Sequence, residues 1–337
     1  MKLITIEEHI TSAEILSDAK KYQESHKNAA GNSQSRQFYG ENSFIGDVLT
    51  DVEKHRIPYM DKEKIDMQIL SYINPMSSAD IPSDIRTENA VKANNYLKSV
   101  VDKNPDRFAA FATLPLWDVD ASVSELERSV KELHLKGALV TGKLEGHFLD
   151  EKKFIPLFKK AEELDVPIYF HPSMPVDEVL DYYYKSSEGD WNDVAALRFG
   201  SAGFGWHLDI GIQMVRMILS GIFDKCPRLK LVTGHWGEGI ISMLDRLDYM
   251  LPKNITGLQK NISDYYRENI YITPSGIKSP VNLEATVKYL GADRIIWSVD
   301  YPYIRDKGFT DFLMKSNLTD EEKELISHKN AERLFKI

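Results

Sequence analysis

The sequence predicts a single α/β domain of the (β/α)8 TIM-barrel class, and three observations support this prediction. Eight short apolar or β-branched runs recur along the 337 residues. The segments between them show helical periodicity, so strands alternate with helices as they do around a parallel barrel. An open doubly wound sheet is the competing fold, but such a sheet generally carries a glycine-rich nucleotide-binding turn, and no early run is followed by one.

The predicted strands are almost continuously apolar, which suits parallel strands that are covered on both faces. They span residues 3–7, 66–72, 108–114, 138–141, 167–171, 229–234, 270–273 and 295–300. After the third strand, Val123, Leu126, Val130 and Leu133 fall on one helical face. No Pro/Gly/Ser-rich linker and no internal repeat marks a boundary, so one domain over residues 1–337 is predicted.

Two long connections interrupt the alternation of strands and helices. They cover about residues 11–61 and 173–206, and each follows the carboxyl end of a predicted strand. In a (β/α)8 barrel the active site lies at that end of the strands. We therefore expect both connections to overhang the mouth of the site.

The composition excludes several classes of function. Lys and Arg number 42 against 51 Asp and Glu, a net charge of −9 without any basic block, so nucleic acid is not expected as a partner. No apolar run approaches the roughly 18 residues of a membrane span, and the N-terminus lacks the features of a signal peptide. We expect a cytoplasmic protein without membrane contact. The single cysteine, Cys226, rules out an internal disulfide and a cysteine-cluster metal site.

Histidines and carboxylates gather at the carboxyl ends of the predicted strands. These residues are Glu7, His9, His171, His235 and Asp300. In a barrel such ends converge on one pocket, and an imidazole and carboxylate set suits Zn²⁺ or Mn²⁺ with one or two positions left open. The remaining histidines are expected to be solvated or packed, namely His26, His55, His134, His147, His207 and His328.

The first strand carries the motif Glu7-Glu8-His9. Since residues i and i+2 of a strand share a face, Glu7 and His9 are expected to project into the barrel while Glu8 points away. His235 stands at the expected start of a helix, whose dipole would disfavour the imidazolium. Glu238, one helical turn later, would favour it.

Two further sequence patterns are weaker indications of function. The segment from Gly137 to Lys143 fits a phosphate-binding loop, but Leu144 stands where Ser or Thr is required. The run Tyr182-Tyr183-Tyr184 either lines a pocket or packs the long connection around it.

The motifs at the strand ends resemble those of the amidohydrolase-related, metal-dependent decarboxylases, above all hydroxybenzoate decarboxylases such as the γ-resorcylate and 2,3-dihydroxybenzoate enzymes. The motifs are Glu7-x-His9, Tyr169-x-His171-Pro172, Gly234-His235-x-Gly237-Glu238 and Ser298-x-Asp300-Tyr301-Pro302. The resemblance covers nearly the whole chain. Lys143 matches the bridging lysine of two-metal amidohydrolases only loosely, so one metal ion is expected.

The resemblance implies a site, a substrate class and an assembly. It implies one divalent metal ion, Zn²⁺ or Mn²⁺, held by Glu7, His9, His171 and Asp300, with no organic cofactor. It also implies that His235 and Glu238 form a catalytic pair beside the metal and that Asp300 takes part in proton transfer. A small aromatic acid is the implied substrate, and a homodimer or homotetramer is the implied assembly.

The implied reaction places a proton on the ring carbon that bears the carboxylate, after which CO₂ leaves. A nearby dication lowers the pKa of a carboxyl group and so opposes Asp300 as the proton donor, which leaves His235 as a second route for the proton. Two alternatives stay open: a metal-dependent hydrolase or hydratase of the same superfamily, and a non-catalytic metal-binding barrel. A pair such as His235 and Glu238, which adds nothing obvious to metal binding, favours an enzyme.

Overall fold

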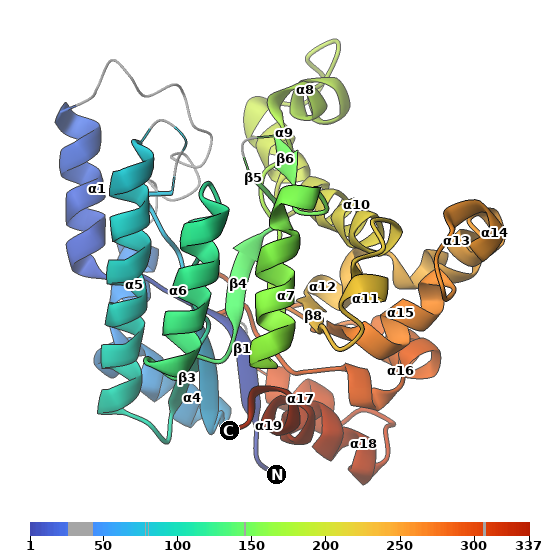
Figure 1. Cartoon of the computed structure of the whole chain (residues 1–337). Helices are drawn as coiled ribbons and strands as arrows, with labels where there is room; N and C mark the ends of the chain where they lie inside the picture. The colour runs from blue at the N-terminus through green and yellow to red at the C-terminus, as the bar shows by residue number, and fades with distance from the viewer. Residues whose placement is uncertain (26–42, 78, 80, 145, 306–307) are drawn as a thin grey trace.

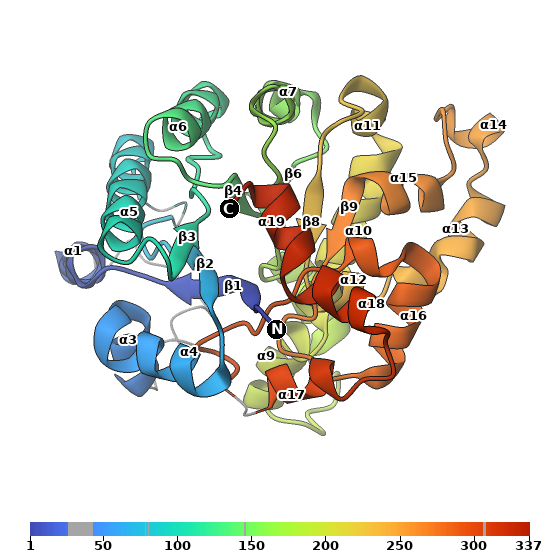
Figure 2. The ribbon, with the colours of Figure 1, turned by 90° about the horizontal axis from the view of Figure 1, so that it is seen from below.

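The computed structural model of the protein describes residues 1–25, 43–77, 79, 81–144, 146–305 and 308–337. Within these residues parallel strands form a ring that helices surround (Figure 1 and Figure 2). The strands are β1 (Ile4–Ile10), β2 (Met67–Tyr72), β3 (Phe108–Ala110), β4 (Ala138–Thr141), β7 (Ile168–His171), β8 (Leu231–Thr233) and β9 (Ile270–Ile272), with a separate antiparallel pair β5 (Lys143–Leu144) and β6 (His147–Phe148).

Isolated bridges close the ring. Strands β1, β2 and β3 form one parallel sheet, and β4, β7, β8 and β9 form another. The bridges join Ala112 to Ala138, Ile272 to Ile295 and Ile6 to Ser298. Residues 295–298 thereby complete the circle between β9 and β1, and the predicted (β/α)8 barrel is confirmed.

The last run of the ring is less regular than the strand predicted over residues 295–300. Its backbone groups are partly taken by C-terminal elements, because the N–H of Trp297 donates to the carbonyl of Ile326 at 3.2 Å. The carbonyl oxygen of Ile295 accepts from the Asn330 side chain at 2.7 Å. Since these bonds satisfy backbone groups that a ladder would otherwise pair, the run is held in place without a continuous ladder.

Helices fill the connections and cover the outside of the ring (Figure 2). The α-helices are α1 (Ala13–Ser25), α3 (Ser43–Thr50), α4 (Ile57–Glu63), α5 (Ser83–Lys103), α6 (Val119–Lys131), α7 (Ile155–Leu164), α8 (Asp177–Val179), α9 (Asp193–Gly200), α10 (Gly205–Leu219), α11 (Ile222–Lys225), α12 (His235–Glu238), α13 (Leu244–Met250), α14 (Lys253–Thr256), α15 (Ile262–Asn269), α16 (Pro280–Leu290), α17 (Phe309–Met314), α18 (Asp320–Glu324) and α19 (Asn330–Phe335). Shorter helical turns are η1 (Val52–Arg56), η2 (Lys152–Phe154), η3 (Leu180–Tyr184), η4 (Ile241–Met243), η5 (Ala292–Arg294) and η6 (Leu325–Lys329). Within the described part of the chain, none of these helices combines the length and the apolar character that crossing a membrane requires.

Helix α6 illustrates how the predicted periodicity is used. The side chain of Asp118 accepts a hydrogen bond from the N–H of Ala121 at 2.9 Å and so caps the first turn. Leu126 is completely buried, and Val123 and Val130 pack against the same core. One apolar face of the helix therefore covers the barrel.

Apolar side chains form two clusters, one inside the ring and one between the ring and its helices. Ile4 and Ile6 of β1 belong to the inner cluster together with Val232 of β8. Leu3 and Ile10 belong to the outer cluster. The alternation within β1 thus changes between Ile6 and Ile10, and this change positions the site.

Both long connections contain helical segments. The described part of residues 11–61 holds α1, α3, η1 and α4, and residues 173–206 hold α8, η3 and α9. In Figure 1, α8 and α9 lie at the end of the barrel opposite both chain termini.

Candidate metal centre and active site

A bulge in β1 decides where its acidic residues point. Ile4 and Ile6 face the inside of the ring, so simple alternation would turn Glu8 inward and Glu7 outward. The pairing with β2 shifts by one residue between Ile6 and Glu8, and Glu7 has a φ of 66°. The extra residue reverses the alternation, so that Glu7 and His9 turn toward the inside of the ring. Glu8 points away from them, as expected, but it is completely buried.

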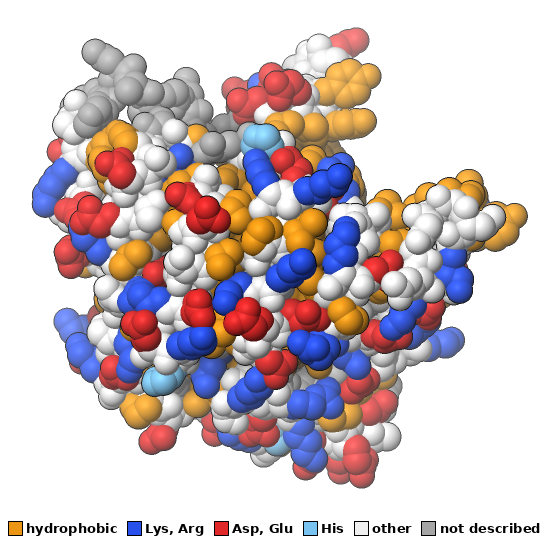
Figure 3. Space-filling view, viewed as in Figure 1, with side chains coloured by type: hydrophobic (Ala, Val, Ile, Leu, Met, Phe, Trp, Pro, Cys, Tyr) orange, Lys and Arg blue, Asp and Glu red, His pale blue; other side chains and the backbone are white. Residues whose placement is uncertain are grey.

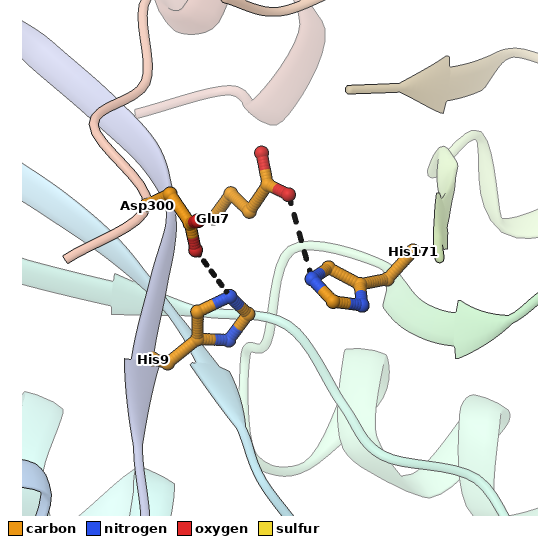
Figure 4. A group of neighbouring side chains, drawn as sticks. All are labelled: Glu7, His9, His171 and Asp300. Atoms are coloured by element: carbon orange, nitrogen blue, oxygen red, sulfur yellow. Dashed lines mark ion pairs between the residues drawn. The ribbon is translucent and has the colours of Figure 1, made fainter. Parts of the chain in front are cut away.

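Four of the predicted residues form one cluster, two of them on β1 and the others at the ends of β7 and the last run of the ring (Figure 4). They are Glu7, His9, His171 and Asp300, and their potential ligand atoms all lie within 4.8 Å of one another. The Nε2 atom of His9 lies 3.0 Å from Oδ1 of Asp300, and Nε2 of His171 lies 3.5 Å from Oε1 of Glu7. The structure therefore brings together the residues that were expected to hold a metal ion.

A hydrogen bond fixes the tautomer of His171. Its Nδ1 atom lies 2.8 Å from the carbonyl oxygen of Pro172, which can only accept, so Nδ1 carries the proton and Nε2 presents a lone pair to Glu7. Burial, with the neighbouring His9 and His235, holds the pKa of His171 well below its usual range, so the ring is neutral. A lone pair that faces a carboxylate oxygen is repelled unless a cation lies between them.

Buried polar atoms without partners mark the same place. Among the described residues, Oε1 of Glu7 and Nε2 of His9 are buried and make no hydrogen bond of acceptable geometry. The Nδ1 atom of His9 lies 3.0 Å from the hydroxyl of Ser71, which leaves Nε2 directed at Asp300. Because nearly all buried polar groups in native proteins are paired, these atoms fit a divalent cation bound by nitrogen and oxygen ligands.

Hydroxyl groups hold the other oxygen of Glu7. Its Oε2 accepts hydrogen bonds from the hydroxyl of Tyr169 at 2.5 Å and from the hydroxyl of Ser275. At Gly234 a Cβ atom would lie 2.6 Å from the Ser275 hydroxyl and 3.3 Å from Glu7 Oε1, so only glycine fits there. Burial raises the pKa of Glu7, whereas a cation beside it would favour the ionised form.

Beside this cluster, Glu238 bridges two histidines. Its Oε1 accepts from Nδ1 of His235 and its Oε2 accepts from Nδ1 of His207, each at 2.8 Å. Although burial opposes the charged ring, Glu238 raises the pKa of His235 to about 9. Burial likewise opposes the carboxylate, but His235 and His207 hold the pKa of Glu238 below its usual value. The arrangement keeps a proton on His235 at neutral pH, and both oxygens of Glu238 already have partners.

His207, expected only to be solvated or packed, instead joins the site. It lies in the first turn of α10, and its ring centroid is 4.2 Å from that of His235. Its position at the start of a helix, away from every predicted strand end, gave no sign of this role. His26 lies outside the described residues.

The backbone around His235 departs from the expected helix. Trp236 and Gly237 have φ values of 57° and 76° within α12, so the segment after β8 is a left-handed turn without an aligned helix dipole. The expected effect of a helix dipole on His235 is therefore absent, and Glu238 dominates. Left-handed non-glycine residues gather around the site, namely Glu7, His235, Trp236, Glu238, Ser275 and Asp300. Such strain persists where the surrounding structure enforces it, commonly at functional sites.

Other residues singled out in the sequence lie elsewhere. Lys143 pairs with Asp209 and takes no part in the cluster. Tyr182 and Tyr183 are 82% and 65% exposed, whereas Tyr184 is buried and packs within the connection against Phe199. Cys226 is buried and free.

Known proteins are similar to this chain in sequence and in fold. The chain matches the amidohydrolase family over residues 50–337. The decarboxylase orsB of Emericella nidulans is 32% identical over 343 residues, which cover 99% of this chain and 97% of that protein. The γ-resorcylate decarboxylase of Polaromonas sp. is also 32% identical, over 86% of this chain and 89% of that protein.

A solved structure extends the likeness to three dimensions. The crystal structure of a dihydroxybenzoic acid decarboxylase from Polaromonas sp. JS666, with bound manganese and the inhibitor 2-nitroresorcinol, aligns with a TM-score of 0.84 at 29% identity. The alignment covers 99% of this chain and 97% of that one. The family match and the relatives both span most of the sequence, and the chain belongs to the amidohydrolase family.

Proposed function

We propose that the protein is a metal-dependent carbon–carbon lyase that removes CO₂ from a hydroxybenzoate-type acid without oxidation. The observation that carries this proposal is the hydrogen-bonded pair of His235 and Glu238. It lies beside a cluster in which buried ligand atoms of Glu7 and His9 make no hydrogen bond. The two relatives described above are both decarboxylases.

We assign one divalent ion to the cluster of Glu7, His9, His171 and Asp300. The unpaired buried atoms and the neutral His171 support this assignment. Two carboxylates among four ligands favour a hard ion, and the Polaromonas structure holds manganese, so we propose Mn²⁺ ahead of Zn²⁺. When bound, such an ion supplies positive charge that orients the carboxylate and the ortho-hydroxyl oxygen of the substrate.

The reaction requires the chain to deliver one proton to carbon. The ring carbon that bears the carboxylate takes the proton; the carbon–carbon bond then breaks, its electron pair restores the aromatic ring, and CO₂ leaves. Although burial opposes the charged ring, the hydrogen bond to the buried carboxylate of Glu238 raises the pKa of His235 and so favours its protonated form. Glu238 and His207 keep its ring in place through the bonds to Nδ1 of each imidazole. Asp300, at the same mouth, takes part in the transfer between His235 and the substrate.

Two other functions fit the site less well. A non-catalytic metal-binding barrel offers no reason for a buried Glu238 shared by two histidines. A hydrolase or hydratase of this family would use the same fold and ligands, and only a difference in products separates it from a decarboxylase.

The deciding experiment incubates the manganese-loaded protein with a panel of mono- and dihydroxybenzoates and, in parallel, with esters and lactones. We expect CO₂ release and a change in ring absorbance for at least one hydroxybenzoate. Hydrolysis of an ester or lactone without CO₂ release from any acid would contradict the proposal.

A variant tests the role of the histidine in the same assay. His235→Asn is expected to keep the fold and the metal content while losing roughly 10²–10⁴-fold in turnover, the usual contribution of a general acid. Retained activity with retained metal would remove His235 from the mechanism. Loss of metal would make it a ligand.

We further propose that the protein forms a homodimer or homotetramer. Helix α10 exposes Leu208, Ile212 and Leu219 on one face, at 41%, 56% and 39% of their surfaces. Apolar side chains also gather over α13 and α14, which project from the body (Figure 3). Exposed apolar patches of this kind are typical of interfaces. Light scattering at micromolar concentration is expected to give a multiple of the 38.5 kDa chain mass, and a monomer mass would contradict the proposal.

We also propose that residues 1–337 act as one domain and that the protein is cytoplasmic. Residues 11–61 and 173–206 are proposed to shape the mouth of the active site. The position of α8 and α9 at the end of the barrel opposite the termini supports this role for the second connection (Figure 1). One buried, unpaired cysteine suits a reducing compartment. Fractionation of the source cells tests the location.

A further inference from the structure

A buried carboxylate behind the metal cluster holds the backbone on both sides of Asp300. The side chain of Glu8 is completely buried. Its Oε1 accepts from the N–H of Val299 at 3.0 Å, and its Oε2 accepts from the N–H of Tyr301 at 3.2 Å. One side chain of β1 therefore binds the residues immediately before and after Asp300.

Glu8 is in turn held by a buried amide and a buried guanidinium. The Nε2 atom of Gln68, on β2, donates to Oε2 of Glu8 at 3.2 Å. The Oε1 atom of Gln68 accepts from Nη1 of Arg56 at 2.9 Å, and Nη2 of Arg56 donates to the carbonyl of His9. Arg56 is completely buried and lies 4.8 Å from the centre of the Tyr301 ring. This network joins the backbone of His9 to that of the last run of the ring.

Asp300 depends on such support more than a residue of a regular strand would. Its φ is 68°, a conformation that side-chain-bearing residues rarely adopt. The run that carries it has only isolated bridges to its neighbours. The N–H of His9 donates to the carbonyl of Tyr301 at 2.7 Å, so bonds from β1 fix the segment on both sides.

We propose that Glu8 is the positioning residue that places the carboxylate of Asp300 in the metal site, with Gln68 and Arg56 holding Glu8. This inference rests on the proposed function, because it takes Asp300 as a ligand. Both oxygens of Glu8 act as acceptors, whereas a glutamine has one acceptor oxygen and an NH₂ group that would face a backbone N–H. Residues behind metal ligands orient them, and their loss typically weakens metal binding about 10–100-fold.

Binding of Mn²⁺ alone tests the inference without any substrate. Electron paramagnetic resonance counts free Mn²⁺ during a titration and reports the symmetry of the bound ion. Glu8→Gln is expected to raise the Kd for Mn²⁺ by about 10–100-fold and to change the spectrum of the bound ion. The matched control is Glu125→Gln on α6, where another buried carboxylate accepts from Asn94 and Arg128 far from the cluster. It is expected to lower the melting temperature and leave the Kd unchanged.

A double-mutant cycle separates positioning from general stabilisation. In the Asp300→Asn background, Glu8→Gln is expected to change the Kd by less than about twofold, because residues that act through one another are not additive. Equal losses in both backgrounds, or an unchanged Kd in Glu8→Gln alone, would overturn the inference. If Glu8→Gln does not fold, Glu8→Asp, which cannot reach both N–H groups, enters the same cycle with the same expected coupling. Failure of the unaltered protein to bind Mn²⁺ would overturn the metal assignment and this inference with it.

Discussion

Replacing Glu238 by glutamine removes the charge that holds a proton on His235. The carboxylate is buried and lies 2.8 Å from Nδ1 of both His235 and His207, so solvent screens it little. Against the opposing effect of burial, Glu238 is the first of three carboxylates, with Glu7 and Asp300, that raise the pKa of His235 from 6.5 to about 9, a shift of roughly 3 kcal/mol. Glutamine has nearly the same shape, and its oxygen can still accept from one imidazole. The substitution therefore changes charge far more than geometry.

We expect the alkaline limit of decarboxylation to move toward acid in the Glu238→Gln variant. The unaltered enzyme should lose kcat/KM at alkaline pH, where His235 loses its proton; its pKa is about 9 without metal, and a bound cation lowers that limit. Without the carboxylate, burial of the imidazole acts with less opposition, and the limit should fall by about two pH units. The assay is initial CO₂ release from about pH 6 to pH 10, with metal content measured on each sample.

A matched control variant tests whether the shift in the pH profile is specific to Glu238. Glu151 makes the same kind of contact with His147 at 2.9 Å, but at the surface and away from the site, so Glu151→Gln should leave the profile unchanged. An alkaline limit that does not move in a fully metal-loaded Glu238→Gln enzyme would refute the reasoning. Loss of metal from that variant would show that Glu238 is a ligand.

Four further outcomes are expected. Elemental analysis should give close to one divalent ion per chain, whereas a value near two would favour a binuclear hydrolase. His171→Ala should lower metal content and activity together, since loss of a ligand weakens metal binding directly, and full occupancy would remove His171 from the ligand set. Gly234→Ala would place a methyl group 2.6 Å from the Ser275 hydroxyl and 3.3 Å from Glu7, so calorimetry should show weaker Mn²⁺ binding than in the unaltered protein; equal affinity would contradict the described packing. The folded-state pKa of His235, about 9, lies above its unfolded value of 6.5, so its contribution to stability is complete below about pH 6.5 and is lost as the pH rises through about 9. Thermal melts of the metal-free protein should show this loss, whereas melts of the His235→Asn variant should not.

The ring was accessible to prediction because most of its strands are buried on both faces and therefore form apolar runs. The run over residues 138–141 coincides with β4. The last run was predicted as a full strand, but its backbone groups bind Ile326 and Asn330. Nothing local in residues 295–300 reveals these distant partners.

The site was accessible for a related reason, since strand ends converge in a barrel. Simple alternation predicts that Glu7 and His9 share a face, but this face points into the barrel only because the bulge reverses the alternation set by Ile4 and Ile6. His207 could not be found because its contact with Glu238 depends on how α10 packs against the turn after β8. These are properties of tertiary packing, and sequence periodicity does not encode them.

The bonds from Glu8 to Val299 and Tyr301 span 291 and 293 residues of sequence. This separation affects how the protein folds during its synthesis. During synthesis, β1 leaves the ribosome long before its second neighbour in the ring exists. Until that neighbour arrives, one edge of β1 lies open to the wrong strands or to other chains, and Glu8 has no backbone partner. Contacts of such long range also delay folding. A nascent chain therefore lacks the support that Glu8 gives to the segment around Asp300, and the proposed metal site becomes complete only after this last run has joined the ring.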